Sequence, residues 1–253
     1  MVAAVFFILI GIAVAGLTLI VRPTLFWGHP KANFARRFLG ERGATVFYLL
    51  FSVSAIILGI YLINKINAEK ELEEITIAYK KGDFEEVQER LISFTWWHPR
   101  YYMAWTMLGN IYLDQDNSKS AIECFNNGIS ANKNAFEPYS GLGRTYAKKR
   151  EYEKAKEEYL KANAIHPNDW STIGNLAELY DDLGDVKKAV EFGERSVVLN
   201  PESAILCANL CIYYHKDKQF DKRDHMYEIA EDLDYDNMQS LRDAFALSND
   251  SLK

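Results

Sequence analysis

The chain has 253 residues and a formal net charge of −6, and 49% of its side chains are hydrophobic. This length allows a sizeable core and two units. Residues 1–67 carry six Lys or Arg and one acid, a charge of +5, which leaves −11 for the remainder. An acidic remainder argues against nucleic acid as a partner, because phosphate binding rests on clustered Lys and Arg side chains.

Two uncharged segments near the N-terminus, residues 1–21 and 44–64, predict membrane-spanning helices. Each has about 20 residues, which is enough to cross a hydrocarbon core of roughly 30 Å. The first segment lacks the basic start of a signal peptide, and its apolar run is too long for one. We therefore expect a retained transmembrane hairpin over residues 1–67, with spans at about 2–21 and 44–64 in the lipid bilayer.

The distribution of Lys and Arg predicts the orientation of this hairpin. The connecting segment 22–43 carries five of these residues, and the segment before it carries none. After the second span, four lysines are mixed with many acids: Lys65, Lys70, Lys80 and Lys81. The connecting loop is therefore expected in the cytoplasm, which makes the chain a two-pass protein of the bacterial inner membrane with a periplasmic second unit.

The cysteines favour the opposite orientation. The chain has three, Cys124, Cys207 and Cys211, with no spacing typical of a disulfide framework. Such a set is more typical of a reducing compartment. A cytoplasmic second unit therefore stays open as the alternative.

The second span is expected to continue as one helix beyond the membrane. Between Gly59 and Gly82 the sequence has neither glycine nor proline. Because these residues are the usual helix breakers, the helix is predicted to run on through residues 69–80.

A period of 34 residues follows. Four positions of the first full unit are Trp105, Leu108, Gly109 and Tyr112. They recur as Tyr139, Leu142, Gly143 and Tyr146, then as Ile173, Leu176, Ala177 and Tyr180, and then as Cys207, Leu210, Cys211 and Tyr214. Later positions repeat as Ala121 with Phe125, Ala155 with Tyr159 and Ala189 with Phe192, and units end at Pro99, Pro167 and Pro201.

This W-x2-L-G-x2-Y … A-x3-F … P pattern resembles the tetratricopeptide repeat (TPR) family. Full repeats would run over 102–135, 136–169, 170–203 and 204–237, with a degenerate one at 68–101. Each unit reads as two amphipathic helices, and the small residue lets them approach closely. No unit can bury its apolar face alone, so neighbouring units must stack.

One further helix is expected at the C-terminal end. Met238, Leu241, Phe245 and Leu247 are spaced to cap the last repeat over residues 238–253, with Arg242 and Asp243 facing outward. The predicted fold class is therefore all-α: an N-terminal transmembrane helical hairpin, then a TPR α-solenoid of about five helix pairs over 68–253, ending in a capping helix.

The aromatic stretch TWWHPRYYMAW spans the end of one repeat and the start of the next. Trp97 stands where the family keeps a buried leucine, and Trp105 stands at the family's own aromatic position. Trp96 is left without a repeat role. Three interpretations remain for it: a membrane-proximal contact with the first unit or with lipid headgroups, a contact with a partner, or an ordinary surface position.

Standard catalytic signatures are absent from the sequence, so we expect no enzyme and no cofactor. Cys207, Cys211 and His215 follow one helical face and resemble a soft-metal set. They would extend over about 12 Å along a straight helix, too far to share one ion. Buried thiols at repeat positions are the preferred interpretation, and no metal site is expected.

The TPR resemblance implies a protein or peptide partner, bound in the groove that the first helix of each unit lines. The candidate partner-binding residues are Asn110, Arg144, Lys148, Asn175, Glu178, Asp181, Asp182 and Asn209. The alternative is a solvated face of mixed charge. Ser171 and Asn175 stand where the basic carboxylate clamp of some family members would be, which disfavours a chaperone-tail receptor. The oligomeric state stays open.

The hairpin has a resemblance of its own. Pro23, Phe26, Trp27 and Gly43 match small two-helix membrane immunity proteins of bacterial polymorphic toxin systems. Two functions follow. The first is a membrane-anchored scaffold or assembly factor that binds another protein through its solenoid. The alternative is an immunity protein that neutralises a toxin at the membrane.

Overall fold

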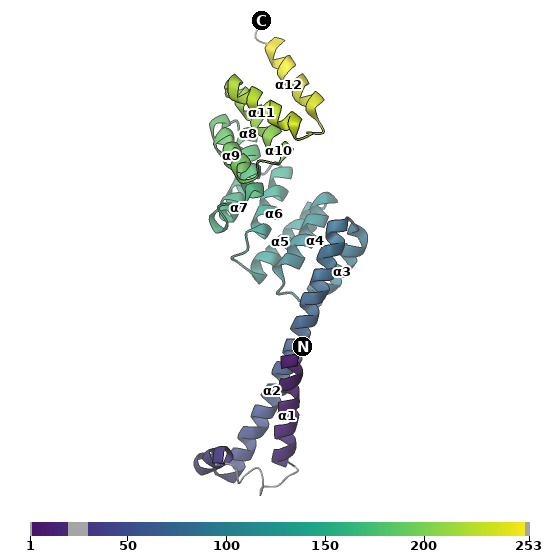
Figure 1. Ribbon diagram of the computed structural model, residues 1–253, viewed down its shortest axis with the longest axis vertical. Helices are drawn as coiled ribbons and strands as arrows, with labels where there is room; N and C mark the ends of the chain where they lie inside the picture. Colours follow the sequence, from purple (N-terminus) through teal and green to yellow (C-terminus); the bar gives the residue numbers. More distant parts are fainter. Residues whose placement is uncertain (1, 20–29, 251–253) are drawn as a thin grey trace. The chain divides into compact units, whose positions relative to one another are not determined.

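The computed structural model describes residues 2–19 and 30–250, with side chains described for residues 3–16, 39, 40, 42–243 and 245. Within these ranges the chain forms twelve helices and no strand (Figure 1). They divide into two compact units, Met1–Asp83 and Phe84–Lys253. The sequence places this division at residues 67 and 68. The units divide later because the last helix of the first unit ends only at Lys81.

Helices α1 (Val2–Leu19) and α2 (Pro30–Lys81) form the first unit and pack along each other through small residues. A Cβ atom at Gly11 would lie 2.6 Å from Ile56 Cγ1, and one at Gly59 would lie 2.4 Å from Ile8 Cγ1. Any larger residue at these two glycines would push the backbones apart. The other small residues buried in this unit are Ala4, Ala44, Ser52, Ala55 and Ala68.

Many large apolar side chains of the first unit are exposed, although Ile75 is buried. Leu50 is 65% exposed and Ile57 is 61% exposed. The other exposed large apolar residues are Val5, Phe6, Leu9, Ile12, Leu39, Val46, Phe47, Phe51, Val53, Leu58, Ile60, Tyr61 and Ile77. Small residues inside and large apolar residues outside reverse the usual arrangement of a helix pair in water.

Length and composition distinguish one segment of the first unit. Arg42–Lys81 is long and apolar enough to cross a membrane, with a mean hydropathy of 2.5 in its most apolar window, and Ala3–Gly16 is a shorter apolar helix. α2 leaves helical geometry at Gly40 (φ 70°, ψ 176°) and then continues to Lys81, as the lack of Gly and Pro predicts. Pro23, Phe26 and Trp27, on which the immunity resemblance depends, lie outside the described residues.

The second unit consists of ten helices, most of them in antiparallel pairs. They are α3 (Phe84–Trp97), α4 (Tyr102–Asp114), α5 (Ser118–Ala131), α6 (Glu137–Lys148), α7 (Tyr152–Ile165), α8 (Trp170–Asp182), α9 (Val186–Leu199), α10 (Ala204–Lys216), α11 (Phe220–Asp232) and α12 (Met238–Asp250). The tightest contacts join α4 to α5, α6 to α7, α8 to α9 and α10 to α11. Each of these pairs corresponds to one predicted repeat.

A residue with a left-handed backbone conformation follows the first helix of each 34-residue repeat, at the same position in every repeat. Positive φ angles occur at Gly82, Asp116, Arg150, Gly184 and Lys218, which are spaced by 34 residues. A residue in this conformation lets a backbone N–H cap the last carbonyls of the helix. Only two of the five are glycine, so stacking of the units maintains the turn where the local sequence does not favour it.

Side-chain caps begin several of the helices. The Asp169 carboxylate accepts a hydrogen bond from the Thr172 backbone N–H at 2.7 Å at the start of α8. Asn117 caps α5 by accepting from the Ser120 backbone N–H at 3.2 Å. Both caps satisfy donors that have no partner within the helix.

The predicted small positions bring the paired helices together. A Cβ atom at Gly109 would lie 2.7 Å from the Phe125 ring, and one at Gly143 would lie 2.4 Å from the Tyr159 ring. Phe125 and Tyr159 are both buried. The aromatic of the second helix therefore fills the space that the glycine leaves on the first.

Trp97 corrects one expectation of the sequence. It stands at a position expected to be buried, yet it is 74% exposed. The buried face of α3 is formed by Leu91, Phe94 and Thr95. At about 100° per residue, Trp97 points well away from that face.

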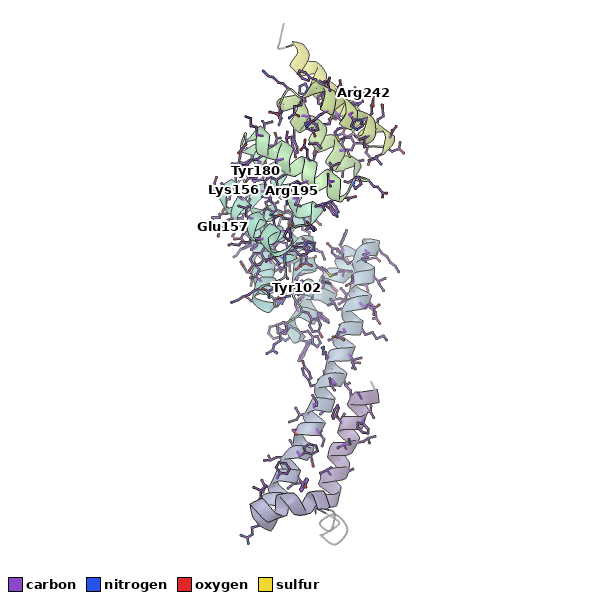
Figure 2. The ribbon with its side chains drawn as sticks, turned by 60° about the vertical axis from the view of Figure 1, so that its left-hand side comes forward. Tyr102, Lys156, Glu157, Tyr180, Arg195 and Arg242 are labelled. Carbon is purple, nitrogen blue, oxygen red and sulfur yellow. The ribbon has the colours of Figure 1, made fainter. Side chains whose placement is uncertain are left out.

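The predicted capping helix is present as α12. Leu241 is buried, and the Phe245 ring stacks on His215 with 4.8 Å between ring centroids. Arg242, marked in Figure 2, is exposed as expected. It reaches Glu231 of α11 at 2.7 Å. Asp243 is also exposed, and the Leu247 side chain lies outside the described residues.

Candidate functional site

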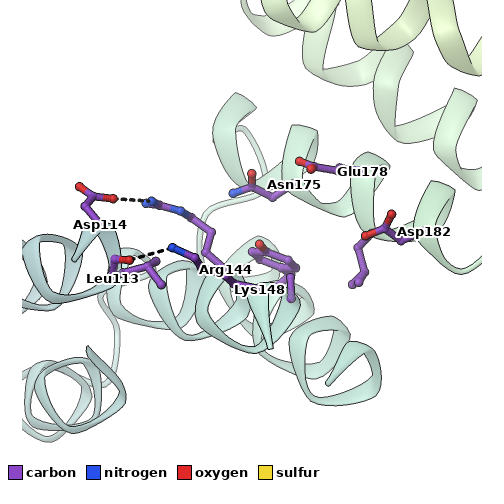
Figure 3. A pocket seen from close by; sticks show the side chains of 10 residues that line it. Leu113, Asp114, Arg144, Lys148, Asn175, Glu178 and Asp182 are labelled. Carbon is purple, nitrogen blue, oxygen red and sulfur yellow. Dashed lines mark hydrogen bonds and ion pairs between the residues drawn. The ribbon is translucent and has the colours of Figure 1, made fainter. Parts of the chain in front are cut away.

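A pocket of about 370 Å³ opens between α4, α6 and α8, the first helices of three successive units (Figure 3). The second-helix residue Tyr159 of α7 also contributes to its lining. The lining residues are Leu113, Asp114, Arg144, Ala147, Lys148, Tyr159, Asn175, Glu178, Leu179 and Asp182. Five of the eight candidate partner-binding residues therefore line one pocket.

The basic edge of the pocket is neutralised from within the protein. Arg144 donates to the Asn110 side-chain oxygen at 3.4 Å, and its guanidinium lies 4.0 Å from the Asp114 carboxylate. Lys148 donates to the Leu113 carbonyl oxygen at 3.1 Å and forms an ion pair with Asp116. Both cations are thus turned toward the end of α4, as Figure 3 shows for Arg144 with Asp114 and Lys148 with Leu113.

The acidic edge of the pocket has no such neutralisation. Glu178 and Asp182 are one helical turn apart on α8, and among the described residues neither has an ion pair or a hydrogen-bonding side-chain partner. Asp181, the third candidate acid, is held by Lys216 of α10 at 2.6 Å. Two like charges at this spacing repel each other.

The electrostatics of Glu178 reflect this position. Burial of its carboxyl group in the groove, and then the neighbouring carboxylates Asp182 and Asp181, raise the pKa of Glu178 above its usual value, although the residue as a whole is exposed. Burial also raises the pKa of Tyr159, an effect that Arg144 opposes and Glu178 reinforces. On α10, burial and the same three acids raise the pKa of Tyr213. Glu178 therefore lies in electrostatic contact with two phenols.

The three candidate asparagines differ in their hydrogen bonds and in their position relative to the pocket. The Asn175 side-chain nitrogen is shielded from solvent and donates no hydrogen bond within the described protein. It belongs to the pocket, where Figure 3 places it between Arg144 and Glu178. Asn110 is occupied by Arg144, and Asn209 lies on α10 outside the pocket lining. Among the described candidate asparagines, only Asn175 has a side-chain donor that is both shielded from solvent and unpaired, and buried donors usually have a partner.

A second, smaller pocket of about 250 Å³ lies between α3, α4 and α5. Its lining residues are Ile92, Thr95, Trp96, Trp105, Leu108, Tyr112, Ser120, Glu123, Cys124 and Asn127. Trp96 is 80% exposed, whereas the Trp105 indole N–H donates to the Pro99 carbonyl oxygen at 3.0 Å. Trp105 thus fixes the turn between α3 and α4, while Trp96 stays free at the surface.

The three cysteines are buried thiols. Burial raises the pKa of Cys124 to about 12 and the pKa of Cys211 to about 12, which makes thiolate chemistry unfavourable there. The Cys211 thiol lies 3.4 Å from the Arg223 carbonyl oxygen, and His215 contacts Arg223 at 3.2 Å. Among the described residues no group of three or more His, Cys, Asp or Glu side chains is placed to hold a metal ion.

Comparison with known proteins identifies the repeat. A tetratricopeptide repeat family model matches residues 104–134, 136–169 and 171–203. Anaphase-promoting complex subunit 3 of Schizosaccharomyces pombe is 27% identical over 134 residues, which are 52% of this chain and 20% of that protein. The chain therefore spans only about a fifth of the length of that relative.

Two solved structures share the fold. That of pilF from Pseudomonas aeruginosa matches with a TM-score of 0.62 and 14% identity, over 73% of this chain and 91% of its own. YrrB, described as a TPR protein with an unusual peptide-binding site, matches with a TM-score of 0.52 and 18% identity, over 72% and 93% of the two chains. The chain therefore matches the tetratricopeptide repeat family model over three segments between residues 104 and 203, and shares an all-helical repeat fold with these structures.

Proposed function

We propose that this chain is a membrane-anchored scaffold or assembly factor that binds another protein through the groove of its solenoid. The observation that carries the proposal is the pocket of about 370 Å³, in which the Glu178 and Asp182 carboxylates and the Asn175 nitrogen have no partner among the described residues. The Asn175 nitrogen costs free energy while it is desolvated without an acceptor, and a cationic ligand would offset the repulsion between the two carboxylates, so a ligand that supplies both is favoured. YrrB, which shares the fold, has a peptide-binding site by its own description.

The first unit supports the membrane anchor. In lipid, apolar side chains gain nothing by packing against each other instead of against acyl chains, so transmembrane helices associate through small residues. Gly11 and Gly59 mediate such a contact between α1 and α2, and many large apolar residues are exposed. The segment Arg42–Lys81 is also long enough to span a bilayer.

The proposed orientation follows the positive-inside rule. The loop 22–43 carries five Lys or Arg and would stay in the cytoplasm of a bacterial cell. The solenoid would then lie in the periplasm, and its partner would be a periplasmic or membrane protein.

The experiment compares cross-linked capture from membranes by four full-length proteins. They are the wild type, Arg144→Glu with Lys148→Glu, Glu178→Lys with Asp182→Lys, and a control, Lys154→Glu with Lys156→Glu. The control pair lies on α7, where Lys154 bonds the N-cap residue Glu151 and Lys156 bonds Glu153, and Lys156 is marked in Figure 2. Reversing exposed charges changes folding little, about 0–1 kcal/mol per pair, but disrupts recognition at an interface.

The expected result is that a protein recovered with the wild type and the control is lost, by tenfold or more, with Glu178→Lys/Asp182→Lys, whereas Arg144→Glu/Lys148→Glu, which changes cations already paired within the protein, reduces recovery less. Circular dichroism should show the same helicity for all four. Equal recovery by all four would exclude the groove as the binding surface and leave Trp96 as the next candidate.

A further inference from the structure

The basic and acidic edges of the groove differ in whether their charged groups already have partners within the protein. Arg144 and Lys148 are already bound to Asn110, Asp114, Asp116 and the Leu113 carbonyl oxygen. A ligand carboxylate would have to compete with these contacts for either cation. The basic edge is therefore a poor place for an anionic group of a partner.

The charged groups of the acidic edge, in contrast, have no such partners among the described residues. Glu178 and Asp182 face the pocket from one side of α8 and have no counter-ion among the described residues. Lys216 lies on α10, the first helix of the next repeat. It donates to both carboxylate oxygens of Asp181, at 2.7 and 2.6 Å, and not to Glu178 or Asp182. A ligand cation would relieve the repulsion between the two free acids and gain charge-assisted hydrogen bonds.

Asn175 adds an independent indication. Its side-chain nitrogen is shielded from solvent, lacks an acceptor and belongs to the same pocket, about one helical turn before Glu178. A donor beside a pair of acids suits a peptide, because a backbone carbonyl oxygen can accept from the amide while a nearby basic side chain meets the acids.

We infer that the groove selects a partner segment carrying a Lys or Arg side chain, which lies between Glu178 and Asp182 while its backbone accepts a hydrogen bond from Asn175. The inference rests on the proposed function and names the chemistry of its partner. The pocket volume, at the lower end of the roughly 300–1,000 Å³ typical of ligand pockets, suits one long side chain with adjacent backbone. The Tyr159 ring in the pocket lining adds an aromatic surface for the aliphatic part of the side chain.

The test uses the purified full-length chain in detergent and pools of blocked nonapeptides with randomised flanks. The central residue of each pool is Lys, Arg, norleucine, citrulline or Glu. Norleucine and citrulline reproduce the shape of Lys and Arg without the charge. We expect the Lys and Arg pools to be retained at least tenfold more than their neutral counterparts.

Two variants locate the preference. Glu178→Gln with Asp182→Asn should reduce the preference to within about twofold, because both acids lose their charge while their shape is kept. Glu191→Gln, at an exposed acid on the outer helix α9, should leave it unchanged. Equal retention of all pools, no retention of any pool, or a preference that survives the double variant would overturn the inference. Free spermidine bound as tightly as the Lys pool would also overturn it, by assigning the site to small cations.

A pH series gives a second readout. The charged groups facing Glu178 are Asp181 and Asp182 of its own helix and Arg144 of α6, with the phenols of Tyr159 and Tyr213 beside it. Retention of the Lys pool should fall as the pH drops through the raised pKa of Glu178, and retention of the norleucine pool should not change. Failure of the peptide test alongside groove-dependent capture from membranes would reject this inference alone. Failure of both would reject the proposed function as well.

Discussion

Single glycines control the spacing of the helix pairs, and this control can be measured. At Gly143 an added Cβ would lie 2.4 Å from the Tyr159 ring, which is itself buried. Gly143→Ala should therefore destabilise the solenoid by about 1–3 kcal/mol, the usual cost of overpacking a core. The measurement is denaturant unfolding of the full chain followed by circular dichroism.

Gly174 is the matched control for that change. An added Cβ there would lie 2.9 Å from the end of the flexible Leu206 side chain, which can shift. Alanine is also the better helix former by about 1 kcal/mol. Gly174→Ala should thus be close to neutral, and a loss equal to that of Gly143→Ala would contradict the role assigned to the Tyr159 contact.

The charge of Glu178 should destabilise the folded protein at neutral pH. Because burial and the nearby acids raise its pKa in the folded state, the folded protein retains the proton to a higher pH than the unfolded chain does. The stability due to this proton is complete below the unfolded pKa and is lost as the pH rises through the folded pKa. Glu178→Gln should therefore raise the melting temperature at pH 7, and the difference should vanish below about pH 4.

Asp221→Asn, a change of an exposed acid in the first turn of α11, is the control for Glu178→Gln. A carboxylate at that end stabilises its helix, so the control should not raise the melting temperature at pH 7. An unchanged melting temperature for Glu178→Gln at every pH would remove the electrostatic basis of the acidic edge.

Residue-level contacts were only partly predictable from the sequence. Asn110 and Arg144 are 34 residues apart, so equivalent positions of neighbouring repeats meet, and their contact follows from the period. Lys148 instead bonds Asp116 and the Leu113 carbonyl oxygen, a choice among rotamers that no spacing determines. The sequence predicts Tyr159 only as a core residue. That it also lines the pocket depends on how neighbouring repeats stack, and the structure shows it.

At the scale of elements, α12 is joined to the last repeat by a titratable contact. Burial, and then the positive charge of Arg223, lower the pKa of His215, on which Phe245 stacks. The nearby charged groups are Arg223 and its ion-pair partner Asp224. Because the folded pKa is lowered, this contact stabilises the protein fully above the unfolded pKa of about 6.5 and less as the pH falls through the folded pKa.

Acidification from pH 7.5 to 5.5 should therefore loosen α12 before the rest of the solenoid. The protection of the backbone amides of residues 238–243 against hydrogen exchange, corrected for the intrinsic slowing of exchange at lower pH, should fall over this range in the wild type. In His215→Gln it should change much less, while His225→Gln, at an exposed histidine of α11, should behave like the wild type. Uniform exchange in all three proteins would show that His215 does not control the cap.

The helix pair of the first unit provides a second test at this scale. A side chain at Gly59 would meet Ile8 Cγ1 at 2.4 Å and the Ala4 carbonyl oxygen at 2.8 Å, whereas a Cβ at Gly16 would meet nothing within 4 Å. Gly59→Leu should separate α1 from α2 and lower the melting temperature of the detergent-solubilised protein by several degrees. Gly16→Leu should be tolerated, and equal effects of the two changes would contradict close packing at Gly59.

Element boundaries were predictable where local chemistry determines them. The lack of Gly and Pro after Gly59 correctly predicts that α2 continues to Lys81. The Gly82 turn is visible in the sequence, but its equivalents at Asp116, Arg150 and Lys218 are not, because Arg and Lys do not favour a positive φ and Asp adopts one far less readily than glycine. There the stacked units impose the turn, and only the period of 34 residues reveals it.

For the molecule as a whole, the repeat period was enough to predict an all-helical solenoid, because one supersecondary unit copied along the chain can bury its core in only a few ways. The pairing of charges in the groove could be predicted less well from the sequence. All eight candidate residues were recognisable from their positions on first helices, but which charges are neutralised depends on contacts across repeats. Arg144 and Lys148 appear in the sequence as the basic edge of the groove, and in the structure they are occupied by α4.

The proposed membrane topology is the remaining test at the scale of the molecule. Five Lys or Arg in segment 22–43 against none before it should retain the loop in the cytoplasm and place both ends outside. A reporter that is active only in the periplasm, fused after Lys253, should therefore be active. Changing Arg36, Arg37 and Arg42 to Asn should reduce that activity, because three of the five retaining charges are removed.

A reporter that is active only in the cytoplasm, fused at the same position, tests the opposite orientation. Strong activity of that reporter would reverse the proposed orientation and agree with the three unpaired cysteines, which suit a reducing compartment. The buried thiols are compatible with either side because burial suppresses their reactivity, as the raised pKa of Cys124 and of Cys211 indicates. In the proposed topology loop charge sets the orientation, and a loop-charge variant with unaltered periplasmic activity would show that another part of the chain sets it.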